Sequence, residues 1–223
     1  MRQLILLTLC LACLATPVWP ETVSCEGSNV SVSASTSAYA DMTCNAVEKA
    51  RSLFKQCDFP LPKVPVLIEV VRELKDGCTA VYHCGLDWIE ILEPPFMEAR
   101  RGSGGAFSFL AIEEYFQSVV VHELAHVLYD DVPCPFTSCS ATNEYLAYTI
   151  QIMSLTKEEQ IAFAERSGLD RRISRDELSS IILMMAPDRF AQKAWAHASQ
   201  QGDTCGFLWQ ILDGKVLLDY ERF

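Results

Sequence analysis

The segment from Val119 to Tyr129, VVVHELAHVLY, constrains the fold of this chain more than any other. It is largely apolar apart from His122, Glu123 and His126, and such a run is typical of a buried helix. Residues four apart lie within about 40° of each other around a helix axis, so both imidazoles can face one metal ion. Glu123, rotated by about 100°, is suited to reach a water molecule at that metal. Neutral imidazoles are good ligands for zinc.

A simpler interpretation is that His122 and His126 are core histidines and Glu123 is an ordinary helix residue. Two buried histidines without a metal would each need a hydrogen-bond partner. Chance is a weak explanation for H-E-x-x-H in a chain with only four histidines. The pattern therefore favours a metal site.

A catalytic zinc ion needs a third protein ligand and leaves its fourth position to water. The metzincin continuation is absent, because Tyr129 and Val132 stand where Gly and His would be needed. Asp130 and Asp131 follow the motif too closely to converge easily on the same ion. The remaining option is Glu144, which opens the next helical pattern.

The turn between these two helical patterns supports that option. Pro133 and Pro135 cannot continue the first helix, so it ends there. A second helix over residues 140–154, with Ser140 or Thr142 as its cap, is expected to pack back along the first. Glu144 lies in its opening turns.

The pattern His-Glu-x-x-His, followed eighteen residues after His126 by Asn143-Glu144, resembles the gluzincin zinc metallopeptidases, which include thermolysin-like enzymes and M1-like aminopeptidases. The resemblance covers roughly residues 109–153 and implies a zincin fold. It also implies that His122, His126 and Glu144 bind one zinc ion. Glu123 would then be the general base that deprotonates the zinc-activated water for attack on a peptide bond.

Other roles follow from the same resemblance. Some gluzincins place an acidic residue four positions after the ligand Glu to orient a zinc-bound His, whereas this chain has Tyr148. The Tyr148 hydroxyl could orient a zinc-bound histidine instead, or the carboxylate of Asp130 could do so. The resemblance also implies that an extended peptide pairs with the strand or loop just before the motif helix.

Gluzincins typically stabilise the oxyanion with a Tyr or His downstream of the ligand Glu. His197 is the first candidate here, and the alternative is an ordinary surface or packing histidine. The further candidates are Tyr220, Tyr148 and Tyr145.

The N-terminus predicts export. Arg2 precedes an apolar run over residues 4–15, which has the features of a signal peptide with cleavage after residue 15 or as late as 20. The run is too short to span a bilayer. We therefore expect a periplasmic or secreted protein without a membrane span.

The cysteine content agrees with export. Eight cysteines follow the signal segment, which predicts up to four disulfides in an oxidising compartment. Two local pairs are expected, Cys134 with Cys139 across the turn between the ligand helices, and Cys78 with Cys84. The other pairings are open.

The formal net charge of −11 bears on partners. A chain this acidic should bind neither nucleic acid nor an anionic membrane surface. The charge is suited to basic peptides, although it also serves solubility.

The rest of the chain predicts an α+β fold in a single domain over residues 21–223. A small mixed sheet with a packed helix is expected to precede the motif helix, and the C-terminal half should be helical. Residues 21–35 read as an exposed lead-in with one short strand, and residues 100–105 as a flexible glycine-rich stretch. His83 is expected to be structural. The expected strands are 30–32, 64–71, 79–84, 88–92 and 216–220, and the further helices are 36–54, 156–168, 174–185, 187–200 and 205–212.

These features predict an exported zinc-dependent peptidase that acts on peptides or proteins. Two alternatives are a metal-binding exported interaction protein without proteolytic activity, and a structural module without metal. An intact Glu123 favours the peptidase, because a site that does not hydrolyse needs no such carboxylate.

Overall fold

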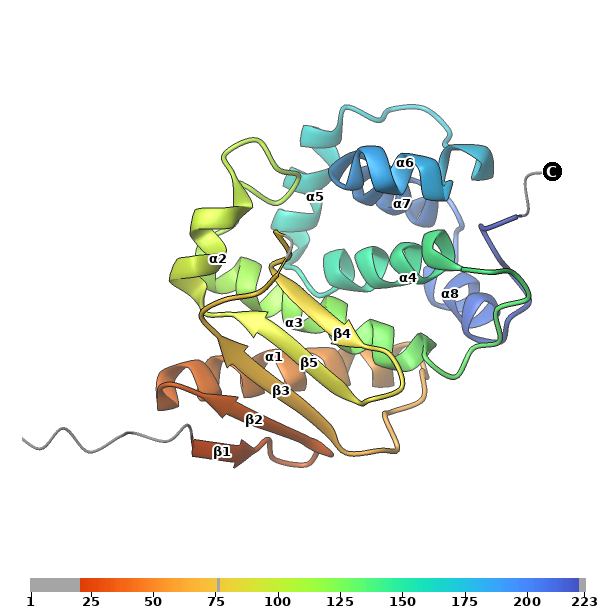
Figure 1. Ribbon diagram of the computed structural model, residues 1–223. Coiled ribbons are helices and arrows are strands. Elements are labelled where there is room, and N and C mark those ends of the chain that lie inside the picture. The colour runs from red at the N-terminus through yellow and green to blue at the C-terminus, as the bar shows by residue number, and fades with distance from the viewer. Residues whose placement is uncertain (1–20, 76, 221–223) are drawn as a thin grey trace, which may run out of the picture.

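The computed structural model describes residues 21–75 and 77–220 (Figure 1), so the predicted signal peptide lies outside the described residues. The strands are β1 (Glu21–Ser24), β2 (Val30–Ala34), β3 (Val66–Val71), β4 (Ala80–His83) and β5 (Trp88–Leu92). The helices are α1 (Ser37–Gln56), α2 (Pro94–Arg101), α3 (Ile112–Tyr129), α4 (Ser140–Met153), α5 (Lys157–Ser167), α6 (Ser180–Met185), α7 (Pro187–Ser199) and α8 (Thr204–Leu212), with a 3-10 turn η1 (Arg175–Glu177). The expected α+β class is confirmed.

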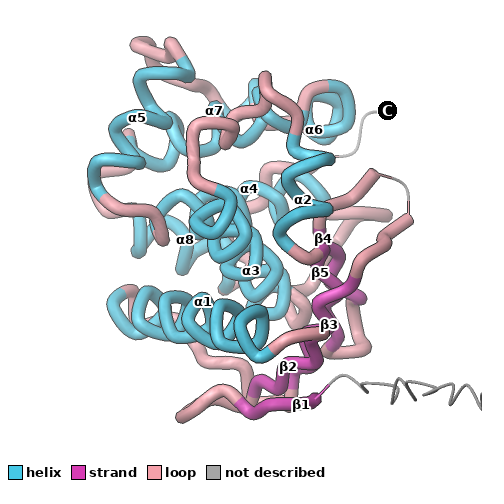
Figure 2. The backbone as a smooth tube through the Cα atoms, turned by 90° about the vertical axis from the view of Figure 1, so that its left-hand side faces the viewer, coloured by secondary structure: helices cyan, strands magenta, loops and turns pink. Residues whose placement is uncertain are grey.

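The five strands form one mixed sheet in the order β1-β2-β3-β5-β4. The central pairs β2/β3 and β3/β5 are parallel, and the outer pairs β1/β2 and β5/β4 are antiparallel. The helices gather on one side of the sheet (Figure 2). Alternate residues of β3 and β5, such as Ile68 and Ile89, are fully buried on that side. Because β4 is last in the strand order, it forms one edge of the sheet, and it lies beside α3.

Helix α3 is buried for most of its length, as the apolar run predicted. Glu113 and Glu114 in its first turn complement the positive end of the helix dipole. It packs on α1 and on α4, and α4 runs back beside it after the proline-containing turn. The disulfide Cys134–Cys139 closes that turn, as expected.

Two further disulfides, Cys25–Cys44 and Cys57–Cys205, join the N-terminal region to α1 and α1 to α8. Such bridges form in oxidising compartments. The expected Cys78–Cys84 bridge is wrong, because both cysteines are free and exposed. They flank the extended strand β4, which rises about 3.3 Å per residue, while a disulfide needs Cα atoms within about 7 Å. No helix in the described part of the chain is long and apolar enough to cross a membrane.

Four local expectations about secondary structure need correction. In residues 21–35 the expected short strand is present as β2, but Glu21–Ser24 form a second strand, β1, which the polar sequence of this edge did not indicate. Helix α2 was not expected; it begins with Pro94 and Pro95, which a first helical turn tolerates. The helix expected over 174–185 is interrupted at Leu178, which leaves helical geometry and is fully buried. Residues 216–220 form no strand.

Residues 216–220 instead cap the helix that carries Glu144. The carboxylate of Asp219 accepts hydrogen bonds from the backbone N–H groups of Ala141 at 3.0 Å and Thr142 at 2.8 Å. The Thr142 hydroxyl donates to the same carboxylate at 2.7 Å. Helix α4 has no side-chain cap of its own, so this distant aspartate satisfies its first N–H groups.

We expect Asp219→Ala to lower the free energy of unfolding by about 2–3 kcal/mol, because it leaves buried donors without a charged acceptor. Denaturant unfolding of the metal-free protein measures this loss. Asp213→Ala is the matched control, since Asp213 forms only an exposed pair with Lys215 and should cost well under 1 kcal/mol. Equal losses in the two variants would contradict the capping role.

Candidate metal centre

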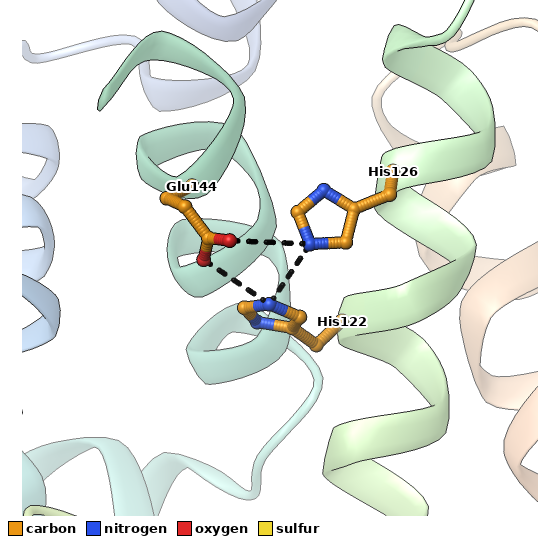
Figure 3. Close-up of side chains that lie close together, drawn as sticks. All are labelled: His122, His126 and Glu144. Carbon is orange, nitrogen blue, oxygen red and sulfur yellow. Dashed lines mark hydrogen bonds and ion pairs between the residues drawn. The ribbon is translucent and has the colours of Figure 1, made fainter. Parts of the chain in front are cut away.

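Helices α3 and α4 bring three potential ligands together. Figure 3 shows His122 and His126 on one face of α3, pointing toward Glu144 on α4. The two imidazole Nε2 atoms are 3.1 Å apart. Nε2 of His122 lies 3.4 Å from Glu144 Oε2, and Nε2 of His126 lies 3.7 Å from Glu144 Oε1. All three residues thus offer ligand atoms within 4.8 Å of one another, as the sequence predicted.

These separations fit a tetrahedral metal ion. Zinc binds nitrogen and oxygen ligands at about 2.0–2.2 Å, so two ligand atoms of a tetrahedron lie roughly 3.3–3.6 Å apart. The observed separations of 3.1, 3.4 and 3.7 Å bracket that value. The donor set of two imidazoles and one carboxylate is also one that catalytic zinc uses.

The tautomers of the two histidines give a second test of fit. Nδ1 of His122 lies 3.0 Å from Oε1 of Gln151, and Nδ1 of His126 lies 2.8 Å from Oδ1 of Asn143. Amide oxygens only accept hydrogen bonds, so each Nδ1 is a donor. In this tautomer Nε2 of each ring carries the lone pair that can bind a metal ion. The amide partners therefore hold both rings with Nε2 directed at the candidate site, as the outer hydrogen bonds of metal-binding histidines do.

The orientation of the Gln151 amide is itself fixed. Its Nε2 donates to the Ser118 hydroxyl at 3.1 Å, and that hydroxyl donates to the Tyr115 carbonyl at 2.8 Å. The hydroxyl therefore accepts from Gln151, and the amide oxygen must face His122. A chain of three hydrogen bonds, all partly or fully buried, holds the histidine ring.

Neither orienting amide, Gln151 or Asn143, was predicted from the sequence. Asp130 does not orient a ligand histidine, because its Oδ2 accepts a hydrogen bond from the Gly85 N–H at 3.1 Å. Tyr148 packs edge-on against His122, with ring centroids 4.7 Å apart, and does not hydrogen bond to it. Gln151 could have been found, because a residue seven positions after Glu144 lies on the same helix face.

We expect Gln151→Leu to weaken zinc binding by about 10- to 100-fold, because the His122 ring loses the partner that fixes its tautomer. Zinc affinity is measured by competition with a chelating dye. Gln192→Leu is the control, since Gln192 lies on α7 and does not line the site. Unchanged affinity in Gln151→Leu would show that this hydrogen bond does not tune the metal site.

A cavity of about 560 Å³ opens on the three ligands. The edge strand β4 and the preceding residues 77–79 form one wall, and α3 and α4 form the opposite wall. Phe107, Pro187 and Asp188 complete it. The glycine-rich residues 102–105 are not part of the lining, so the cleft follows β4 rather than that stretch.

Glu123 lies in this cavity beside the ligands and is only 6% exposed. Burial raises the pKa of its carboxyl to about 7, and the neighbouring Glu144 carboxylate adds to the rise. His126 and a backbone hydrogen bond from Tyr82 act in the opposite direction. Glu123 thus lines the same cavity as the three candidate ligands but is not part of their cluster.

The structure separates the candidates for oxyanion stabilisation. Tyr148 lines the cavity, and burial raises the pKa of its phenol, so it keeps a proton to donate. His197 does not line the cavity. Its Nδ1 pairs with the Tyr145 hydroxyl at 2.8 Å, its ring packs on Phe207, and burial lowers its pKa. Tyr220 lies at a separate small pocket.

His197 and Tyr145 thus form a packing pair, and the structure does not place His197 in the cavity of the three candidate ligands. Residue type and position along the chain suggested it, but α7 directs this side chain toward Phe207 and α8. His83 is also structural, because it pairs with Glu90 at 2.8 Å and stacks on Trp88.

Comparison with known families gave one finding. The model of DUF6639, described as a family of unknown function, matches residues 30–221. The match includes the three candidate ligands and Glu123. No curated protein and no solved structure matched the chain.

Proposed function

We propose that this chain, which belongs to the DUF6639 family of unknown function, is a zinc-dependent peptidase. The observation that supports this most strongly is the convergence of His122, His126 and Glu144 beside a buried carboxylate that is not a ligand, Glu123. A structural zinc site is closed by four protein ligands. Here three candidate ligands line a cavity, so a bound zinc ion would keep one position for water or substrate.

Each residue has a role in this proposal. His122, His126 and Glu144 hold the zinc ion, which when bound polarises a carbonyl and makes water a stronger acid. Glu123 accepts the proton of the attacking water at its carboxylate and returns it to the leaving amine. The Tyr148 hydroxyl is our candidate for a hydrogen bond to the developing oxyanion. Gln151 and Asn143 keep the two histidines in the ligating tautomer.

Strand β4 would position the substrate. Its pairing partner β5 occupies one edge, and in the described part of the chain no strand pairs with the other edge. Residues 79–82 line the cavity. An extended peptide can add to such an edge through backbone hydrogen bonds, which places a peptide bond across the ligands. We further propose that the protein acts outside the cytosol, because its three disulfides suit an oxidising compartment.

Metal analysis combined with digestion of an unbiased peptide library tests this proposal. We expect one zinc ion per chain, cleavage of peptides, loss of cleavage on chelation and recovery on adding zinc. One zinc ion per chain without any cleavage would instead support a metal-binding interaction protein. Absence of zinc, and no binding when it is added, would remove the metal site itself.

A further inference from the structure

We infer that the cavity binds a cationic group of its substrate, either a lysine or arginine side chain or a free terminal amine. The binding subsite consists of Phe107, Tyr115, Tyr148 and Asp188, which we call the cation subsite. The inference rests on the proposed function, because it concerns the substrate of that same cavity. It is carried by the arrangement of these four residues in the cavity wall.

Three aromatic rings form most of the subsite. The ring centroid of Phe107 lies 6.0 Å from that of Tyr115 and 6.5 Å from that of Tyr148. Tyr148 also contacts His122, so the aromatic wall begins directly beside the metal ligands. Aromatic faces attract ammonium and guanidinium groups. Tyr115 already holds one such group, because the Arg101 guanidinium lies 5.1 Å from its ring centroid.

Asp188 supplies a carboxylate at the same end of the cavity. Its Oδ1 accepts a hydrogen bond from the Ala106 N–H at 3.0 Å. In residues 21–75 and 77–220 no hydrogen bond or ion pair to its Oδ2 is found, and the residue is exposed. Its charge acts on both tyrosines of the subsite, where it contributes to the raised pKa of each phenol. One carboxylate oxygen thus remains for a ligand.

The charge balance of the cavity favours a cation over an apolar side chain alone. No lysine or arginine of the described residues lines it, whereas Glu123, Glu144 and Asp188 do. Asp188 is the one of these three carboxylates that is neither a proposed zinc ligand nor the proposed base. Arg101 pairs with Glu98 at 2.7 Å and donates to the Leu110 carbonyl, and in the described residues it forms no ion pair with Asp188.

Asp188 also has a structural role, and the test must distinguish it from the binding of a substrate cation. It lies in the first turn of α7, where an acidic residue complements the helix dipole, and it anchors the loop at Ala106. Asp188→Asn keeps an oxygen that can accept the Ala106 hydrogen bond and removes only the charge. Asp176→Asn is the control, because Asp176 lies in η1 and outside the cavity.

The experiment measures peptide binding to the zinc-loaded Glu123→Gln protein by calorimetry, and cleavage of the same peptides by the protein with Glu123 intact. The starting peptide is one that the library digest shows to be cleaved. Lysine or its uncharged analogue norleucine is placed at one position at a time, on each side of the cleaved bond. Each peptide is made with a free and with an acetylated N-terminus. We expect about 10-fold tighter binding where the cationic group reaches the subsite. Asp188→Asn should abolish that preference, and Asp176→Asn should keep it.

The outcomes are distinct. A lysine preference assigns the subsite to a side chain, and a loss on acetylation assigns it to the terminal amine. Peptides that are cleaved with no preference for either cationic group, or a preference unchanged in Asp188→Asn, would overturn the inference and leave the peptidase intact. If no peptide is cleaved or bound, the proposed function fails first.

Discussion

Replacing Glu123 by glutamine is expected to slow peptide hydrolysis by about 10²- to 10⁴-fold, the usual contribution of a general base. Glutamine has nearly the same shape as glutamate and cannot take the proton of the attacking water. The three proposed ligands are untouched, so zinc content should stay at one ion per chain. Single-turnover cleavage of a library-derived peptide gives the rate of hydrolysis, and metal analysis of the same sample gives the zinc content per chain.

The same variant should keep its fold, and this separates chemistry from stability. Glu123 is buried, and a neutral amide costs less to bury than a carboxylate. Glu93→Gln is the matched control, because Glu93 is 4% exposed, pairs with Ser35 and Arg72, and does not line the cavity. Glu93→Gln should retain cleavage even if it lowers stability. A Glu123→Gln protein that cleaves at the original rate would exclude Glu123 as the base.

The parts of the site that the sequence predicted follow from local rules. The spacing of His122 and His126 is set by the helical repeat, and an apolar run of this length buries itself. The prolines after α3 force a reversal, so Glu144 returns to the histidines. None of these steps needs knowledge of distant contacts, and the structure brings all three residues together.

The parts that were missed depend on contacts between segments far apart in the chain. Asp219 caps α4 across 77 residues, so its segment read as a strand rather than as a cap. Gln151 meets His122 only because α4 packs against α3 in one particular register. His197 looked suitable by residue type, yet the packing of α7 on α8 turns it toward Tyr145 and Phe207. Helical periodicity limits which face a residue occupies, but it does not say which neighbour that face will meet.

Zinc is expected to stabilise the folded chain strongly, and His126→Ala should abolish that effect. A ligand that binds only the native state at a free concentration 1,000 times its Kd adds about 4 kcal/mol. For a chain of this size each kcal/mol raises Tm by roughly 2–4 °C, so zinc should raise Tm by about 10 °C. Thermal unfolding with and without zinc measures the shift. Loss of one of three ligands leaves too few donors for tight binding.

His197→Ala is the control for the zinc-dependent rise in Tm, because it removes a histidine that does not line the cavity. Its side chain pairs with Tyr145 outside the cavity, so the variant should lose some stability in the absence of metal but keep the full zinc-dependent rise in Tm. His126→Ala should differ from His197→Ala in its response to zinc. Its metal-free protein should also lose some stability, because the buried imidazole and its hydrogen bond to Asn143 are removed, but it should not respond to zinc. Equal zinc responses in the two variants would mean that the metal binds elsewhere, and the arrangement of His122, His126 and Glu144 would then need another explanation.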